Sequence, residues 1–197
     1  TSNDANWSAV FLNTGGLSLQ WQAVGPGGIN LSGFGDTPIF DFSPNVGNGI
    51  ITITITSNDN FDFTTEFSAP ARDIATVDLS NLENLKRLNL PNNQLSTIDI
   101  SANTALTDLL VDNNILFAID VSSNTLLERF NVNNNNLTTL DLSANINLKS
   151  LDANNNDLTS LDISNSPSLT FINVSSNKLT VLDLSNNNLL SAINLDF

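Results

Sequence analysis

The stretch LTTLDLSANINLKSLDANNND, which runs from Leu137 to Asp157, is repeated with small changes before and after itself. It holds two copies of the pattern L-x-x-L-x-L-x-x-N, and successive copies begin alternately 11 and 10 residues apart, so two copies make a unit of 21 residues. Apolar and polar residues alternate within each copy, which predicts about one short β-strand in each half of the unit. The leading leucines are Leu95, Leu106, Leu116, Leu127, Leu137, Leu148, Leu158, Leu169, Leu179 and Leu190.

A unit of this size cannot bury its own apolar face, so neighbouring units must stack and share a continuous core. The repeat therefore predicts an all-β-dominated solenoid of about six 21-residue coils over residues 73–197. Residues 1–72 lack this period and contain strand patterns such as GIITITITS between turns rich in Gly, Pro and Asn. We expect a small antiparallel, sandwich-like β-domain there, which caps the first coil.

Asparagine recurs where the chain must turn between strands. Its amide both donates and accepts hydrogen bonds, so it can satisfy the backbone of a turn and its own copies in adjacent coils. We therefore interpret the asparagines as structural ladders. One column is Asn93, Asn114, Asn135, Asn156 and Asn177, and the other is Asn103, Asn124, Asn145 and Asn187, with Ser166 in one place.

The phrases LKSLDANNNDL, LTFINVSSNKL and LERFNVNNNNL, which alternate with LTTLDLSAN and LTVLDLSNN, resemble the leucine-rich repeat family, whose signature is L-x-x-L-x-L-x-x-N-x-L. The pattern looks most like the bacterial variant of about 21 residues with a nested signature, often called the IRREKO type. The resemblance covers about residues 74–197. It implies a solenoid that binds macromolecules and has no catalytic residues.

The composition excludes several classes of function. The chain has no Cys, His, Tyr or Met, so it lacks disulfides, thiolate and His-ligated zinc sites, and Ser–His–Asp triads. A net charge of −14 with only six basic residues argues against nucleic acid and anionic membranes as partners. No apolar run is long enough for a transmembrane helix, so we expect no membrane insertion. The absence of catalytic side chains such as His and Cys, together with the resemblance, leads us to expect no enzymatic activity.

Aspartate forms a third column, which is expected to stack at the strand spacing of about 4.8 Å. Two charges at that distance repel by roughly 3–4 kcal/mol at an effective dielectric near 20. Hydroxyls, backbone N–H groups, raised pKa values or bound cations would relieve the repulsion. We interpret the column as a hydrogen-bonded structural ladder, with cation binding as the alternative; catalysis by a carboxylate pair is disfavoured because a ladder offers no cleft. The column is Asp78, Asp99, Asp120, Asp141, Asp162 and Asp183.

No cofactor or metal is expected, and calcium is the nearest alternative. The segment SNDNFDF places Asp59 and Asp62 among other oxygen-bearing side chains. It lacks the Gly and the distal Glu of a calcium loop, so a turn is favoured over a metal site.

Four of the six basic residues lie just before the strand of the asparagine-rich half, whereas the aspartate column lies in the other half. This predicts one acidic face and one mixed face, on which an exposed Phe171 would contact a sugar ring or a protein. The candidate binding residues are Lys86, Arg87, Arg129, Lys149, Phe171, Asn131 and Asn173. The alternative is a face that is merely solvated.

Two functions fit these features. The first is a non-enzymatic recognition or adhesion module, extracellular or on a particle surface, that binds a protein or polysaccharide through a solenoid face. The second is a structural subunit of a larger assembly, such as a surface layer, a fibre or the virion of a bacterial virus. The last phrase, LLSAINLDF, lacks a polar cap, so we expect either that the chain was cut from a longer one or that another copy or a neighbouring chain covers this end.

Overall fold

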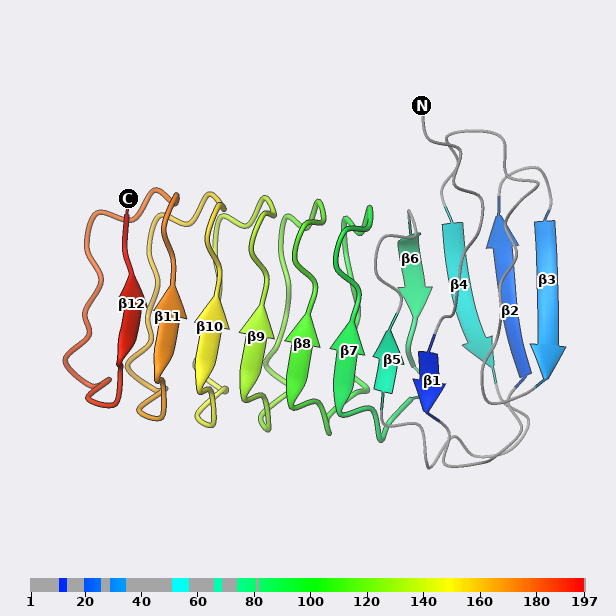
Figure 1. Cartoon of the computed structure of the whole chain (residues 1–197), viewed down its shortest axis with the longest axis horizontal. Coiled ribbons are helices and arrows are strands. Elements are labelled where there is room, and N and C mark those ends of the chain that lie inside the picture. The colour runs from blue at the N-terminus through cyan, green and yellow to red at the C-terminus, as the bar shows by residue number, and fades with distance from the viewer. Residues whose placement is uncertain are drawn as a thin grey trace.

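The computed structural model describes residues 11–13, 20–25, 29–34, 51–56, 66–68, 74–80 and 82–196, with side chains from residue 66 onward. These residues form two sheets and no helix. The first sheet has eight strands in the order β1-β5-β7-β8-β9-β10-β11-β12, and the second has four in the order β3-β2-β4-β6 (Figure 1).

The strands follow the chain in numerical order. They are β1 (Phe11–Asn13), β2 (Gln20–Gly25), β3 (Ile29–Phe34), β4 (Ile51–Thr56), β5 (Glu66–Ser68), β6 (Ile74–Asp78), β7 (Arg87–Asn89), β8 (Asp108–Leu110), β9 (Arg129–Asn131), β10 (Ser150–Asp152), β11 (Phe171–Asn173) and β12 (Ala192–Asn194).

Strands β7 to β12 are the six coils that the 21-residue period predicts. Each pairs in parallel with the next, so that Leu151 of β10 faces Phe130 of β9 and Ile172 of β11. The central residue of each strand from β7 to β11 is buried, and the residues on either side of it are half-buried or exposed. The leucine columns therefore form one continuous core, and the predicted solenoid is confirmed.

Strand β6 contains Asp78, the first residue of the aspartate column, and lies in the second sheet. In the coils of β7 to β12, only the asparagine-rich half, the strand half, forms a strand. The prediction of one strand per half is wrong for the other half, the aspartate half. There the Ser143 N–H donates to Asp141 Oδ1 at 2.9 Å, and the Asn145 N–H donates to the Leu142 carbonyl at 2.9 Å. These donors bond within their own coil, so they cannot form a ladder with the next coil.

The corner asparagines bond to backbone groups, and the two columns do so differently. In the strand half, Asn135 Oδ1 accepts the N–H of Leu116 at 2.9 Å, and its Nδ2 donates to the Val111 and Val132 carbonyls at 3.1 Å. In the aspartate half, Asn124 Nδ2 donates to two carbonyls of the preceding coil, at 3.1 and 2.9 Å. Its Oδ1 is buried without a partner, as are those of Asn103, Asn145 and Asn187.

Each strand from β7 to β11 is followed by a tight turn with one residue in the left-handed region. The φ angles there lie between 50° and 56°, which Asn tolerates better than most residues because its short amide bonds locally. The left-handed turn explains why one asparagine stands at the same place in the turn after each of four strands. The residues are Asn92, Asn113, Asn134, Asn155 and Ser176.

The solenoid sheet begins before the predicted boundary at residues 72/73. Strand β5 pairs in parallel with β7, and its buried Phe67 faces Leu88 across a step of 21 residues. The other sheet is mixed, because β2 is antiparallel to β3 and β4, whereas β4 is parallel to β6. The expected strand in GIITITITS is β4.

Candidate interaction surface

The outward side of β7 to β12, which we call the sheet face, carries two columns of side chains. The Phe171 backbone is in register with Ser150 and Ala192, so Phe171 belongs to the column of Arg129 rather than to the asparagine column. The first column is Arg87, Asp108, Arg129, Ser150, Phe171 and Ala192, and the second is Asn89, Leu110, Asn131, Asp152, Asn173 and Asn194. Both columns flank the buried central residues, so they share one face.

Phe171 is half-buried, which is less exposure than the sequence predicts. Apolar side chains with a larger exposed fraction lie in the aspartate half, where Phe117 is 64% exposed and Val181 is 75% exposed. Neither residue was identified from the sequence, although each stands at a position that is polar or small in most other coils.

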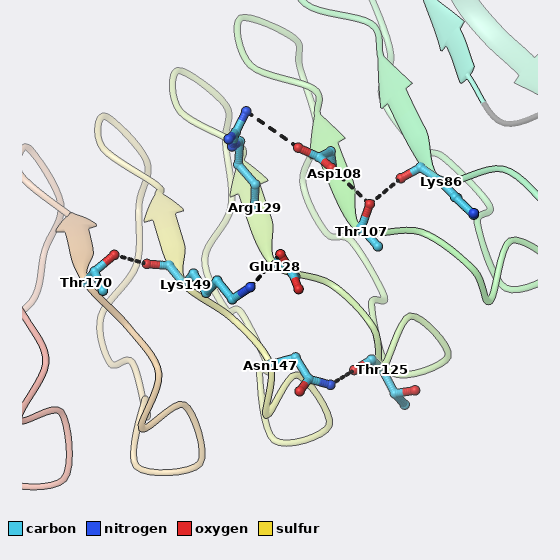
Figure 2. A network of polar contacts seen from close by, with 9 residues as sticks. All are labelled: Lys86, Thr107, Asp108, Thr125, Glu128, Arg129, Asn147, Lys149 and Thr170. Carbon is cyan, nitrogen blue, oxygen red and sulfur yellow. Dashed lines mark hydrogen bonds and ion pairs between the residues drawn. The ribbon is translucent and has the colours of Figure 1, made fainter. Parts of the chain in front are cut away.

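Three basic side chains form ion pairs with acids one coil earlier. Figure 2 shows the pairs of Arg129 and Lys149. Arg129 and Lys149 are two of the candidate binding residues, and the side chain of each is more than half exposed. Each pair joins residues 21 positions apart, a signal that was present in the sequence. The pairs are Arg129–Asp108 at 3.5 Å, Lys149–Glu128 at 2.8 Å and Lys178–Asp157 at 2.6 Å.

The other two candidate basic residues lie one coil beyond β5. Arg87 opens β7, opposite Glu66 in the register, and Lys86 precedes it. Neither forms an ion pair within the described part of the chain. The Lys86 carbonyl accepts the hydroxyl of Thr107 at 3.1 Å, and the Lys149 carbonyl accepts that of Thr170 at 3.0 Å (Figure 2). These bonds tie adjacent coils together just before the strands.

A network of carboxylates and amides covers the carboxyl ends of β8 to β10. Asn131 Nδ2 donates to Asp112 Oδ1 at 3.1 Å, and Asn133 Nδ2 donates to Asp152 Oδ2 at 3.4 Å. Burial raises the pKa of the Asp112 carboxyl and the charge of Asp152 adds to the rise, while hydrogen bonds from its own backbone and from Asn113 oppose it. Neither Asp112 nor Asp152 was identified as a candidate binding residue from the sequence, because neither belongs to a repeated aspartate column.

Serines hold the aspartate ladder in place. The hydroxyl of Ser101 donates to Asp99 at 2.7 Å, and its N–H donates to the same oxygen at 3.0 Å. Such bonds, from the serine two residues on, lower the pKa of five carboxyls of the ladder, those of Asp99, Asp120, Asp141, Asp162 and Asp183. The hydroxyl bond is the larger cause in Asp99, Asp120 and Asp141, and the backbone bond is the larger in Asp162 and Asp183. Repulsion between neighbouring carboxylates is therefore outweighed by local hydrogen bonds.

The aspartate ladder borders two open grooves between coils. One, of ≈ 350 Å³, is lined by Asp120 and Asp141, and another, of ≈ 250 Å³, by Asp162 and Asp183. Among residues 66–68, 74–80 and 82–196, no three acidic side chains gather as metal ligands would. Asp59 and Asp62 lie outside the described residues.

Several solved structures that the chain resembles are bacterial leucine-rich repeat proteins. The functional domain of InlJ from Listeria monocytogenes is 32% identical, with a TM-score of 0.54 over 68% of this chain. A leucine-rich repeat protein of Leptospira interrogans (24% identity, TM-score 0.59, 62% of this chain) and the internalin InlF of Listeria monocytogenes (24%, 0.54, 63%) share the fold. The chain spans 35%, 34% and 41% of these three proteins, respectively.

The chain thus has the leucine-rich repeat fold in a form with 21-residue coils, and these solved neighbours are bacterial leucine-rich repeat proteins. The InlJ domain includes a cysteine ladder, whereas this chain has no cysteine and builds its ladders from asparagine and aspartate. A scan against protein-family models found no match, and neither did a comparison with curated proteins. The described residues contain no helix that is long and apolar enough to cross a membrane.

Proposed function

We propose that this chain is a non-enzymatic recognition module that binds a partner protein through the sheet face. Solenoids present extended surfaces that bind other macromolecules, and the leucine-rich repeat fold is used in this way. The supporting observation is the contrast between the faces. The aspartate half repeats its Asp and Ser in every coil, whereas the sheet face changes from Arg129 to Ser150 to Phe171 along one column.

The sheet face has the composition of a specific interface. It combines an aromatic side chain, an aliphatic side chain at Leu110, two arginines and several amides, and aromatic residues and Arg are enriched where proteins bind proteins. Its charges are partly neutralised by the Arg129–Asp108 pair, so a partner would not have to overcome a uniform negative field. We propose an extracellular or particle-surface location for the module, and no cofactor.

Two matched variants test this proposal. Phe171→Ala truncates the aromatic side chain of the sheet face, and Phe117→Ala truncates an exposed Phe in the aspartate half. Each variant and the unaltered chain would be applied to protein arrays and glycan arrays. Loss of protein hits in Phe171→Ala, but not in Phe117→Ala, is the expected result, with a reduction in affinity of roughly tenfold or more for a central aromatic contact.

Two outcomes would contradict the proposal. Protein hits that depend on Phe117 and not on Phe171 would move the binding surface to the aspartate half. Hits confined to glycans would replace the protein partner by a polysaccharide.

A further inference from the structure

Two half-buried carboxylates lie at the carboxyl ends of β8 to β10 without a basic partner. Asp152 ends β10, and Asp112 follows β8 by two residues. The coil of β9 lies between them, because β9 pairs with both strands. In the described part of the chain neither carboxylate forms an ion pair. Their charges are close enough for Asp152 to contribute to the raised pKa of Asp112.

Neutral amides hold the two carboxylates in position. Asp112 accepts from Asn113 Nδ2 at 2.7 Å and from Asn131 Nδ2 at 3.1 Å. Asp152 accepts from Asn154 Nδ2 at 2.8 Å, from the Asn154 N–H at 3.3 Å and from Asn133 Nδ2 at 3.4 Å. These donors fix the direction of the carboxylates but carry no positive charge. A carboxylate has about four acceptor positions, so acceptor capacity is left at each.

The basic residues nearby are engaged elsewhere. Arg129 is the basic side chain of β9, and it pairs with Asp108 at the opposite end of the strands. Lys149 and Lys178 pair with their own acids one coil earlier. The sheet face therefore keeps two uncompensated negative charges in a partly desolvated setting, where a cation supplied from outside would interact more strongly than in open water.

We propose that Asp112, Asn131, Asn133 and Asp152, which we call the acid–amide patch, receive an Arg or Lys side chain of the partner protein. This proposal rests on the proposed function and names the chemistry of the partner at that surface. Half-buried Leu110 is in register with Asn131 and offers an apolar contact for the aliphatic stem of the incoming side chain. The charge of the patch is complementary to a basic partner, and so is the net charge of −14.

The ligand set favours a side-chain cation over calcium. Calcium takes six to eight oxygen ligands, often from several carboxylates. The patch provides two carboxylates on either side of one coil, and several of their lone pairs are already used by amides. An Arg or Lys head needs only a few acceptors, so the existing hydrogen bonds can remain.

The experiment uses tri-arginine amide as the probe, titrated into the isotope-labelled chain and followed by NMR. The expected result is a set of saturable shifts centred on the side-chain amides of Asn131 and Asn133 and the carboxyl carbons of Asp112 and Asp152. The variant D112N/D152N should weaken binding roughly fivefold or more, because it removes two charges in a half-buried setting. The control variant D141N/D162N removes the same charge from the aspartate ladder and should leave the shifts at the patch unchanged.

Three results would overturn the inference. The first is a set of shifts centred on the aspartate ladder instead of the patch. The second is a loss of binding in the control variant as large as that in D112N/D152N. The third is that calcium chloride, and not tri-arginine, produces the shifts at the patch. The first two results can be measured with tri-arginine amide alone, without an identified partner protein. The location of the shifts is measured on the unaltered chain, so it does not depend on how a variant folds. The proposed function fails separately, when array binding is insensitive to Phe171, so the two failures are distinguishable.

Discussion

The two asparagine columns make a quantitative prediction about which of them stabilises the solenoid more. Replacing Asn135 with Ala removes the only acceptor of the buried Leu116 N–H. It also removes one of the side-chain donors to the Val111 and Val132 carbonyls, each of which keeps a donor from a neighbouring ladder amide. The largest single loss is therefore an orphaned buried N–H.

Asn124→Ala is the matched control, because it removes the same atoms from the other column. The Nδ2 of Asn124 donates to the carbonyls of Ile100 and Asn103, and both carbonyls also accept backbone N–H groups. Its Oδ1 has no partner, so the substitution also removes a buried, unsatisfied acceptor. An orphaned buried donor costs about 1–3 kcal/mol and a lost hydrogen bond about 1 kcal/mol. We therefore expect about 3 kcal/mol of lost stability for Asn135→Ala and about 1 kcal/mol for Asn124→Ala, beyond a cavity term that the two share.

Urea denaturation followed by far-ultraviolet circular dichroism measures the difference. The two variants should have equal m-values and different midpoints, since a changed m-value would indicate that the coils no longer unfold together. Equal losses, or a larger loss for Asn124→Ala, would refute the reasoning, because the unpaired Oδ1 would then be contributing a bond that the geometry does not show.

Three further predictions concern serines. Ser166→Asn should raise stability by about 1 kcal/mol in the same urea assay, because an Nδ2 there can donate to the preceding coil as Asn145 and Asn187 do, whereas the Ser166 hydroxyl makes a single bond of 3.3 Å. Ser176→Asn should add about 0.5 kcal/mol, because φ is 54° at that position and Asn tolerates the left-handed region better than Ser; unchanged stability would contradict this. Ser143→Ala should raise the pKa of Asp141, measured by carbon NMR titration, because the hydroxyl bond that lowers it is lost. A folded pKa below the unfolded value stabilises the fold above the unfolded pKa and is lost as the pH falls through the folded pKa, so Ser143→Ala should lessen the fall in stability over that acidic interval.

Inward-facing residues could be predicted from the sequence because they obey the period. A leucine such as Leu151 must face the core, since a shift by one residue would expose the whole column. The corner role of Asn135 followed from its position after the strand, and both of these residues lie where the repeat predicts. The aspartate half was predicted less well, because alternation alone does not distinguish a laddered strand from a segment whose N–H groups bond to its own Asp side chain.

Some features of the surface could have been predicted by applying the 21-residue step to side chains outside the core. Subtracting 21 from Arg129 gives Asp108, and subtracting 21 from Phe171 gives Ser150, which would have identified the ion pair and the correct column. The half-burial of Asp112 was not readable in this way. It depends on how the amides of Asn113 and Asn131 fold over the carboxylate, which is a matter of side-chain rotamers rather than of period.

Repetition within one chain separates what the fold needs from what it leaves open. The Asp–x–Ser motif recurs coil after coil with the same hydrogen bonds, as at Asp99 and Asp141, so its regularity is accounted for by local geometry. The sheet face shares the same scaffold and spacing, yet the column that contains Arg129 and Phe171 changes from coil to coil. The coil of β9 places Asn131 and Asn133 between two unpaired carboxylates. Packing imposes no such asymmetry, because every strand from β7 to β11 buries its central residue in the same way. The asymmetry of the sheet face therefore lies outside the requirements of the fold, and this is why the search for a partner should begin there rather than on the acidic ladder.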